Sequence, residues 1–408
     1  MNDREFDVVV WGATGFTGSL VAEYLLAQYG IGGDLRWAIG GRSESKLAAL
    51  KERLGSRAES LPTIVADSMD KDALSALAAR TRVVLTTVGP YAKYGTPLLE
   101  ACVEAGTSYC DLCAEVQWLR RMMDTYGDRA AETGARIVHC CGFDSIPSDI
   151  GVWYLQREAK RRHGEYCEKV LMVVKAVKGG ASGGTAASIV NLVKETREDP
   201  EARRFVAKPY SLNPEGKRDG PRVKDQQGPV YNKALKAWTA PFIMAVSNTR
   251  IVRRSNALQD FIYGEDFVYD ETIVTGPGAA GRIKALSISA GLGLLLVNAA
   301  FTPTRYVLER FILPKPGEGP DANARANGFF NVVHVGTLHN GETIKVRVTG
   351  DRDPGYGSTS KMLAESAVCL ARNELAVGGG FWTTASAMGE PLHKRLVDNA
   401  GLTFDVVD

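Results

Sequence analysis

Three glycines near the start of the chain are spaced three residues apart. Gly12, Gly15 and Gly18 follow an apolar run at residues 6–11, short enough for a buried strand, and a helical pattern covers 16–29. In this order the helix N-terminus presents backbone N–H groups that bind a pyrophosphate, which a Cβ at the close-approach positions would block. The pattern therefore predicts a dinucleotide-binding turn. A structural glycine-rich loop is the alternative.

The end of the next predicted strand, residues 35–39, indicates which dinucleotide binds. An NAD site usually has an acidic residue here that accepts a hydrogen bond from the ribose 2′-OH. This chain instead has two glycines followed by Arg42, with Ser43 as helix cap and Lys46 one turn further. Because a guanidinium matches phosphate geometry, we expect NADP(H). A solvent-exposed basic helix start is the alternative.

The strand predicted at residues 83–88 leads into Gly89, Pro90 and Tyr91. Ligands bind at the carboxyl ends of strands in a doubly wound sheet, so this strand end would line the nicotinamide side. Tyr91 is a candidate to orient a substrate carbonyl or to donate a proton. A loop tyrosine that packs on the next helix is the alternative.

The strand predicted at residues 135–141 leads into a polar turn at 142–149 on the same edge of the sheet. Asp144 and Ser145, together with the backbone N–H groups of 142–144, are candidates to act on a substrate oxygen. The turn also contains a proline at a helix start, and it would serve as a helix cap by itself.

The predicted cofactor contacts come from the ends of four strands. Asp67, after the strand at 63–67, is a candidate for the adenine edge or, alternatively, a helix cap. The full predicted set is Gly12, Thr14, Gly15, Phe16, Thr17, Gly18, Arg42, Ser43, Asp67, Val88, Gly89 and Pro90.

The cysteines give no strong indication of a metal or redox site. Cys110 and Cys113 have the C-x-x-C spacing, but structural zinc needs four ligands. The other candidates, His139, Cys140 and Cys141, would have to align with them. Small buried cysteines in a parallel sheet are the preferred interpretation, so no metal is expected. An odd total of seven cysteines fits a reducing compartment.

The composition is that of a soluble globular protein, with 45% hydrophobic and 24% charged residues. A length of 408 residues exceeds one ordinary core, so two domains are expected. The net charge of +2 disfavours nucleic acid as the main partner. Residues 2–5 are polar and lead directly into the first strand without a signal peptide, so we expect a cytoplasmic protein.

The second half has a different pattern. A glycine-rich turn at 178–185 is a second candidate anion site or, with more support, a hinge between strand and helix. Residues 199–233 have no sustained periodicity and indicate an irregular insertion or a flexible lid. Arg250, Arg253 and Arg254 form a basic cluster, either a solvated face or a clamp for an acidic group.

Residues 285–301 form an apolar segment without a charged side chain. A membrane-spanning helix needs about 20 mostly apolar residues, and the polar side chains and glycines here weaken that interpretation. The flanking basic residues are Arg282, Lys284, Arg305, Arg310 and Lys315. An apolar segment between basic ends suits a membrane interface or a dimer groove. We therefore expect an interfacial or protein-buried helix, with peripheral contact at the inner face of the cell membrane, and it is also a natural wall for an acyl chain.

The order of the predicted elements gives the fold class, α/β. Residues 1–160 alternate strands and helices and predict a Rossmann domain with a doubly wound parallel sheet. Residues 161–408 predict a second, α+β domain with an antiparallel sheet, because strands at 331–335 and 343–349 flank an Asn-Gly turn. This sheet is a candidate homodimer surface. The C-terminal helix is a candidate to pack back on the first domain.

Seven motifs together resemble the saccharopine dehydrogenase-like oxidoreductases and, within them, the trans-acting enoyl reductases. The motifs are residues 12–18, 40–42, 88–91, 141–149, 183–185, 252–255 and 314–320. In that family a glycine often precedes the acidic residue that matches Glu115, whereas this chain has Ala114 there.

The resemblance implies an NADPH-dependent enoyl reductase that acts in trans on the C=C bond of a polyketide or lipid intermediate. Two alternatives stay open. A saccharopine-type imine reductase would need cationic partners for substrate carboxylates, for which the cluster at 250–254 is the obvious source. A catalytically silent, cofactor-binding protein associated with a membrane is the other.

Overall fold

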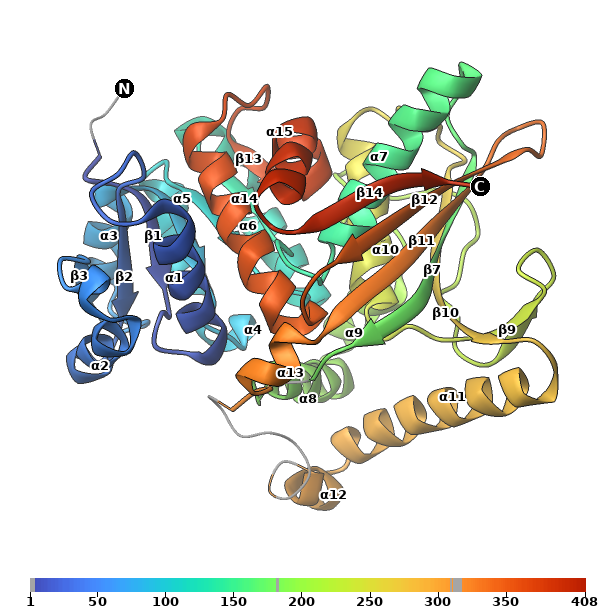
Figure 1. Ribbon diagram of the computed structural model, residues 1–408, viewed down its shortest axis with the longest axis horizontal. Helices are drawn as coiled ribbons and strands as arrows, with labels where there is room; N and C mark the ends of the chain where they lie inside the picture. Colours follow the sequence, from blue (N-terminus) through green and yellow to red (C-terminus); the bar gives the residue numbers. More distant parts are fainter. Residues whose placement is uncertain (1–3, 181–182, 309, 311–317) are drawn as a thin grey trace.

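The computed structural model describes residues 4–180, 183–308, 310 and 318–408. Figure 1 shows two sheets side by side, one formed mainly by the blue N-terminal part of the chain with the C-terminal strand β13 (Gly380–Trp382) at its edge, and one formed by green, yellow and red parts. Each sheet has seven strands. This arrangement confirms the predicted α/β fold class.

The neighbouring strands of the first sheet all run parallel. In order across the sheet they are β13 (Gly380–Trp382), β6 (Arg136–Val138), β5 (Ser108–Asp111), β4 (Thr81–Thr86), β1 (Phe6–Trp11), β2 (Trp37–Gly41) and β3 (Thr63–Val65). The order reverses beside β1, where the glycine turn follows. A ligand site is expected at such a switch point.

Strand β1 lies at the centre because both of its faces are apolar. Val8 and Val10 belong to one buried cluster, while Val9 and Trp11 belong to another. Alternate residues of a strand point to opposite faces, so helices must cover both. One face is covered by α1 (Phe16–Tyr29), α2 (Glu44–Leu54) and α14 (Thr359–Arg372), and the other by α3 (Lys71–Arg80), α5 (Thr96–Glu104) and α6 (Val116–Thr133).

The helix starts of the first sheet follow local sequence signals. Helix α1 has the predicted bounds, and Ser43 caps α2 by accepting a hydrogen bond from the backbone N–H of Lys46. Helix α3 begins later than expected, because Asp70 is its cap. The prediction of Asp67 as the cap of a helix that starts at Met69 was therefore wrong. Asp67 instead accepts a hydrogen bond from the N–H of Met69 in the turn before the helix.

Strand β13 comes from the last thirty residues of the chain and pairs with β6 at the edge of the first sheet. These residues lie in the range 161–408, which the sequence assigns to the second domain, although the strand is part of the first sheet. Helix α14 also returns to this sheet, since its apolar side chains share a cluster with those of β1 and α1.

The second sheet is mixed. Its order is β14 (Leu402–Val407), β12 (Thr343–Gly350), β11 (Phe329–Thr337), β7 (Lys169–Lys178), β10 (Val268–Gly276), β9 (Ala237–Ala240) and β8 (Val230–Asn232). Strands β7 and β10 are parallel and the remaining pairs are antiparallel. The predicted hairpin is formed by β11 and β12, and Gly341 in its turn has a φ of 85°.

The other helices connect the sheets or lie outside them. They are α4 (Tyr91–Tyr94), α7 (Ile146–His163), α8 (Gly183–Glu198), α9 (Pro200–Ala207), α10 (Ala245–Leu258), α11 (Gly278–Ala300), α12 (Thr302–Val307), α13 (Ala322–Ala326) and α15 (Thr384–Asp398), with a one-turn π-helix, η3 (Pro354–Ser358). Figure 1 shows α11 along the lower edge of the molecule, outside both sheets.

Candidate functional site

The glycine turn after β1 has the geometry that its sequence predicts. Gly12 has a φ of 83°, and a Cβ on it would lie 2.6 Å from Cγ2 of Val88. A Cβ on Gly18 would overlap the carbonyl oxygen of Gly12, so Gly18 allows α1 to pack closely on the strand end. A Cβ on Gly15 would approach the same oxygen to 3.2 Å. All three positions therefore require glycine or strongly favour it.

The first turn of α1 presents unused hydrogen-bond donors. Within the described part of the chain, the backbone N–H groups of Thr14, Phe16, Thr17 and Gly18 donate to no protein group. These donors lie at the positive end of the helix dipole. Together with the space that the missing Cβ atoms leave, they fit the pyrophosphate of a dinucleotide.

Arg42 lies at the carboxyl end of β2 and is exposed. Its guanidinium makes no hydrogen bond or ion pair with any described residue. Ser43 is occupied as the cap of α2, and Asp67 is exposed at the end of the neighbouring strand. A free guanidinium beside the glycine turn fits the 2′-phosphate of NADP(H).

Residues of the second half cover the glycine turn. The ring of Phe16 packs against Tyr356 of η3 at 5.1 Å between centroids, and the guanidinium of Arg325 in α13 lies 5.5 Å from the Phe16 centroid. A Cβ on Gly319 would overlap the same ring. The side chain of Phe16 therefore joins the two halves, which leaves its backbone N–H for the predicted cofactor contact.

The end of β4 is fixed to the glycine turn. The N–H of Thr87 donates to the carbonyl of Trp11 at 3.1 Å, and Thr87 Oγ1 donates to the carbonyl of Gly12 at 3.3 Å. Val88 and Pro90 are half-buried and Gly89 is exposed. These predicted contacts thus lie directly beside the phosphate-binding turn, where a nicotinamide ring would follow the pyrophosphate.

Tyr91 is placed at this strand end as expected, but its hydroxyl is already used. It donates to the carbonyl of Thr86 and accepts from the N–H of Leu112, both at 3.2 Å. The ring packs on Trp118, and burial raises the pKa of the phenol well above its usual value. The geometry favours the alternative of a packing tyrosine and gives no support to Tyr91 as a proton donor.

Glu115 determines how α4 is oriented. Its carboxylate accepts hydrogen bonds from the N–H groups of Tyr91 and Ala92 at 2.9 and 3.0 Å, and from Ser188 Oγ of α8 at 3.2 Å. Burial raises the pKa of this carboxyl, and the two backbone N–H groups oppose that shift. Since these bonds satisfy its oxygens, Glu115 positions α4 and α8 instead of contacting a substrate.

Asp144 is the half-buried carboxyl at the exit of β6. Removal from water raises its pKa to about 7, and the nearby charge of Asp111 adds to the shift. Among the described residues it has no side-chain hydrogen-bond partner. A carboxyl with a pKa near 7 that accepts only from its own backbone N–H keeps an oxygen available for proton transfer.

The other candidates in this turn are bound internally. Ser145 is buried, and its Oγ donates to Oδ1 of Asn248 at 3.0 Å, while Asn248 donates to the buried carboxyl of Glu271. The N–H of Phe143 donates to Thr359 Oγ1 at 3.0 Å. The geometry therefore gives Ser145 a structural role and leaves Asp144 as the available side chain.

A buried pair that the sequence reasoning missed lies under this edge. His139 Nδ1 and Asp111 Oδ2 are 2.7 Å apart, and Asp111 Oδ1 accepts from the N–H of Cys113 at 2.9 Å. The signal was available, because parallel pairing of Cys110 with Val138 places the next residues side by side. Within the described residues, no group of three or more His, Cys, Asp or Glu side chains is arranged to hold a metal ion.

The basic cluster of α10 is neither a solvated face nor a clamp that is open to an acidic ligand. Arg250, Arg253 and Arg254 are buried, with exposed fractions of 3 to 6%. Their guanidinium groups donate to backbone carbonyls: Arg250 to Val206, Arg253 to Pro209 and Tyr269, and Arg254 to Leu212 and Phe381. Arg250 also forms an ion pair with the carboxylate of Asp225. Both expectations for this cluster were wrong, since the arginines fix residues 206–212 in place.

Known proteins similar to this chain identify its family. The family model of the saccharopine dehydrogenase NADP binding domain matches residues 8–138. A Mycobacterium tuberculosis relative, classed by its name among the trans-acting enoyl reductases, is 42% identical over 407 residues, 96% of each chain. The trans-acting enoyl reductase of Mycobacterium ulcerans is 39% identical over 406 residues, also 96% of each chain. This chain belongs to the trans-acting enoyl reductase family of saccharopine dehydrogenase-like proteins.

As a family member with this domain, the protein is an NADP-dependent oxidoreductase. The structure of apo saccharopine dehydrogenase (L-Glu forming) from Saccharomyces cerevisiae has the same fold as this chain. Its TM-score is 0.53 at 14% identity, over 99% of this chain and 100% of that one.

Two motifs of the trans-acting enoyl reductase resemblance lie largely outside the described residues. They are most of 314–320 and the side chains of 183–185. The second motif is part of the predicted anion site at 178–185, of which residues 181–182 also lie outside the described residues. In the described part of that turn, a Cβ on Gly179 would lie 2.9 Å from Pro354.

Proposed function

We propose that the protein reduces the C=C bond of an α,β-unsaturated acyl thioester from polyketide or lipid synthesis. The observation that carries this proposal is the burial of the α10 arginines. It distinguishes between reduction of a C=C bond and reduction of an imine, either of which the fold could catalyse. An imine reductase of the saccharopine type needs cations for substrate carboxylates. The arginines at 250, 253 and 254 are buried and bound to carbonyls, so they do not offer those cations.

The names of the relatives support the same choice. Proteins that are 39 to 42% identical across 96% of both chains are named as enoyl reductases that act in trans. The enoyl thioester group itself is uncharged, so it needs no cation of the kind that a substrate carboxylate needs.

The chain's own residues divide the work as follows. The free N–H groups at the start of α1 and the Arg42 guanidinium hold the cofactor, and NADPH when bound supplies a hydride to the β-carbon. Asp144 holds a proton near neutral pH because its pKa is about 7. We assign to Asp144 the proton that the α-carbon gains, so that one hydride and one proton saturate the double bond.

Consumption of NADPH tests the proposal directly. The purified protein is mixed with NADPH and an enoyl thioester, and separately with NADPH, an α-keto acid and an amino acid. Loss of NADPH absorbance only with the enoyl thioester is expected. Turnover only with the keto acid and amine would favour the imine reductase. Tight cofactor binding without turnover in either mixture would favour the catalytically silent alternative.

We also propose that the enzyme works in the cytoplasm as a homodimer, in contact with the inner face of the cell membrane. Support for a dimer comes from β8 at the edge of the second sheet, where Val230 and Tyr231 are 49 and 46% exposed. An edge strand with exposed apolar side chains is suited to pairing with another chain. The molar mass in solution tests the dimer, and a monomer at micromolar concentration would refute it.

A further inference from the structure

Helix α11 is long and apolar, yet most of it is exposed. It has 23 residues, and only 11% of its most apolar 18-residue stretch is buried. By length and composition it is the one helix in the described residues that is able to cross a membrane. Ile283, Leu286, Leu294 and Val297 are 48 to 64% exposed. Their spacing of three, eight and three residues places them on one outward face.

The opposite face of α11 is attached to the protein. Ala285 and Ala299 are fully buried, and Ala299 shares an apolar cluster with Val190 of α8. At the C-terminal end, the guanidinium of Arg197 donates to the carbonyl of Ala300 and lies 5.1 Å from the centroid of the Phe301 ring. A spanning helix is surrounded by lipid or by other spanning helices, whereas α11 lies along the protein surface. The geometry therefore favours a helix that lies in an interface.

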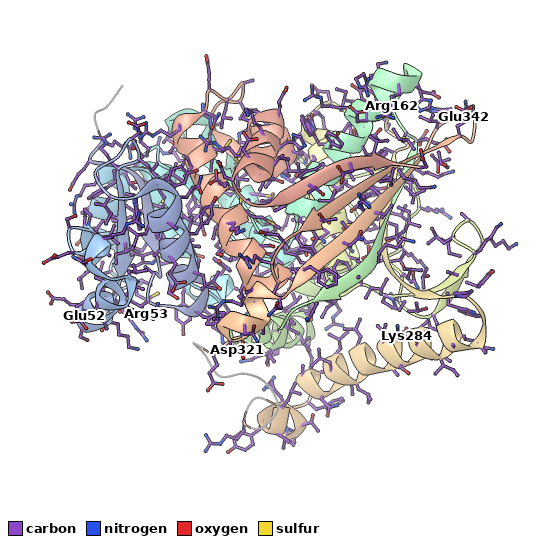
Figure 2. The ribbon with its side chains drawn as sticks, viewed as in Figure 1. Glu52, Arg53, Arg162, Lys284, Asp321 and Glu342 are labelled. Atoms are coloured by element: carbon purple, nitrogen blue, oxygen red, sulfur yellow. The ribbon has the colours of Figure 1, made fainter. Side chains whose placement is uncertain are left out.

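The charges around this face have one sign. Arg282, Lys284 and Arg305 are the charged residues between Glu271 and Glu309, so no acidic side chain occurs along α11 or α12. Figure 2 shows Lys284 on α11, at the side of the molecule away from the first sheet. Exposed apolar residues also continue past the helix end, where Phe301, Tyr306 and Val307 are 48 to 64% exposed. Apolar side chains flanked by cations match anionic lipid headgroups over an acyl layer.

We propose that α11 and α12 dock on an anionic lipid bilayer, with the outward face of α11 inserted at the level of the headgroups. Contacts of α8 connect this surface to the candidate cofactor site. Helix α8 packs on α11 through Val190, and Ser188 of α8 donates to Glu115, which orients α4 beside Pro90. Docking thus places the bilayer against the helix that borders the site, which suits an acyl substrate. The docking itself does not depend on the proposed reaction.

Flotation of the full-length protein with lipid vesicles tests the docking. Vesicles of phosphatidylcholine with phosphatidylglycerol are compared with vesicles of phosphatidylcholine alone. The protein is expected to float with the anionic vesicles and to stay behind with the neutral ones, and salt is expected to weaken the binding. The double variant Leu294→Glu with Val297→Glu is expected to lose vesicle affinity by roughly tenfold or more.

A single substitution on another surface controls for the effect of an added surface charge. Val397→Glu changes an exposed valine, 43% accessible, on α15, and it should float like the wild type. All variants should bind NADPH equally, which shows that they are folded.

Three results would overturn the proposal. The first is wild-type protein that does not float with anionic vesicles, or that binds neutral vesicles equally well. The second is a double variant that floats like the wild type. The third is a wild-type dimer that the double variant converts to a monomer in the absence of lipid, since the face would then be covered by a second copy of the chain.

Discussion

Arg42 and Asp144 share a property that distinguishes them from the other candidate residues. Neither the Arg42 guanidinium nor the Asp144 carboxyl bonds to another residue of the described protein, whereas the Tyr91 hydroxyl bonds to two backbone groups and the Ser145 hydroxyl to a side chain. Half-buried polar groups normally find partners, so the Asp144 carboxyl at the ligand edge of the sheet is a candidate for catalysis. The exposed Arg42 guanidinium is a candidate for binding because it lies beside the glycine turn and carries a charge that no described residue neutralises. Residue type and strand-end position alone do not distinguish Arg42 and Asp144, which are available to a ligand, from Tyr91 and Ser145, which are not.

Replacing Arg42 by alanine should weaken NADPH binding much more than NADH binding. Loss of a charge-assisted contact to the 2′-phosphate is expected to raise the dissociation constant for NADPH by roughly 10- to 100-fold. Titration calorimetry with both cofactors measures the difference. Arg53→Ala is the control, because Arg53 is exposed in α2, the helix that follows Arg42, and pairs weakly with Glu23 at 3.8 Å. Equal losses for NADPH and NADH would rule out the phosphate assignment.

Replacing Asp144 by asparagine should remove a pH dependence from the reaction. The wild-type rate is expected to fall above about pH 7 as the proton is lost, while Asp144→Asn should be slower by roughly 10²- to 10⁴-fold and nearly independent of pH. Profiles of kcat and kcat/KM measure this. A variant that keeps the wild-type profile would show that Asp144 is not the proton donor.

The same substitution, which should slow the reaction, should increase the stability of the folded protein at high pH. The pKa of Asp144 is raised from 3.8 to about 7 on folding, so the folded state binds more protons between these values and its stability falls as pH rises through them. Asparagine does not ionise, so Asp144→Asn does not lose stability in this way as the pH rises. Its melting temperature relative to wild type should therefore be higher at about pH 8 than at about pH 5. A difference that does not change with pH would contradict the raised pKa.

At the scale of the elements, the glycine turn joins β1 and α1 so closely that one methyl group disrupts it. In Gly18→Ala the added Cβ overlaps the Gly12 carbonyl oxygen, so a stability loss of about 1–3 kcal/mol and a large loss of NADPH affinity are expected. Gly127→Ala in α6 is the control, because a Cβ there meets nothing within 4 Å. The control should instead gain about 0.5–1 kcal/mol. Urea unfolding and cofactor titration measure both, and normal NADPH binding by Gly18→Ala would contradict the close packing.

Helix α10 fixes an irregular segment, and Arg254 tests this role. Arg254→Met removes donors to the carbonyls of Leu212 and Phe381, which should lower the free energy of unfolding by roughly 1–3 kcal/mol. The KM for substrate should stay within about twofold, because the side chain lies outside the site. The exposed Arg222→Met is the control. A KM that rises at unchanged stability would restore the arginines as substrate ligands.

The elements that could be predicted from sequence are those with local causes. The bounds of α1 follow from the glycines that flank it, Gly15 at its start and Gly30 at its end, and the cap of α2 follows from Ser43. Partners distant in sequence could not be predicted. An arginine on a helix normally faces solvent, and the burial of Arg254 depends on carbonyls 42 and 127 residues away. The partner of the Tyr91 hydroxyl likewise lies on another strand end.

At the scale of the whole molecule, the two sheets are joined by a buried polar network. Glu365 of α14 is fully buried and accepts from the hydroxyls of Tyr24 and Tyr29 on α1 at 2.7 and 2.6 Å, and from Arg395 of α15 at 3.2 Å. Burial, with the charge of Glu365, raises the pKa of both tyrosines. The sequence predicts the helix at 16–29 and a C-terminal helix, but it does not show that the carboxylate of Glu365 connects them.

Strand β13 has a consequence for the order in which the chain folds. The first sheet receives its edge strand from residues 380–382, so a nascent chain that has left the ribosome only as far as residue 160 carries the open edge of β6. An unpaired edge strand promotes pairing with other chains. The cofactor half is therefore not an autonomous unit that folds first. An isolated fragment of residues 1–160 should aggregate, and completion of the nucleotide-binding sheet should wait for the end of synthesis.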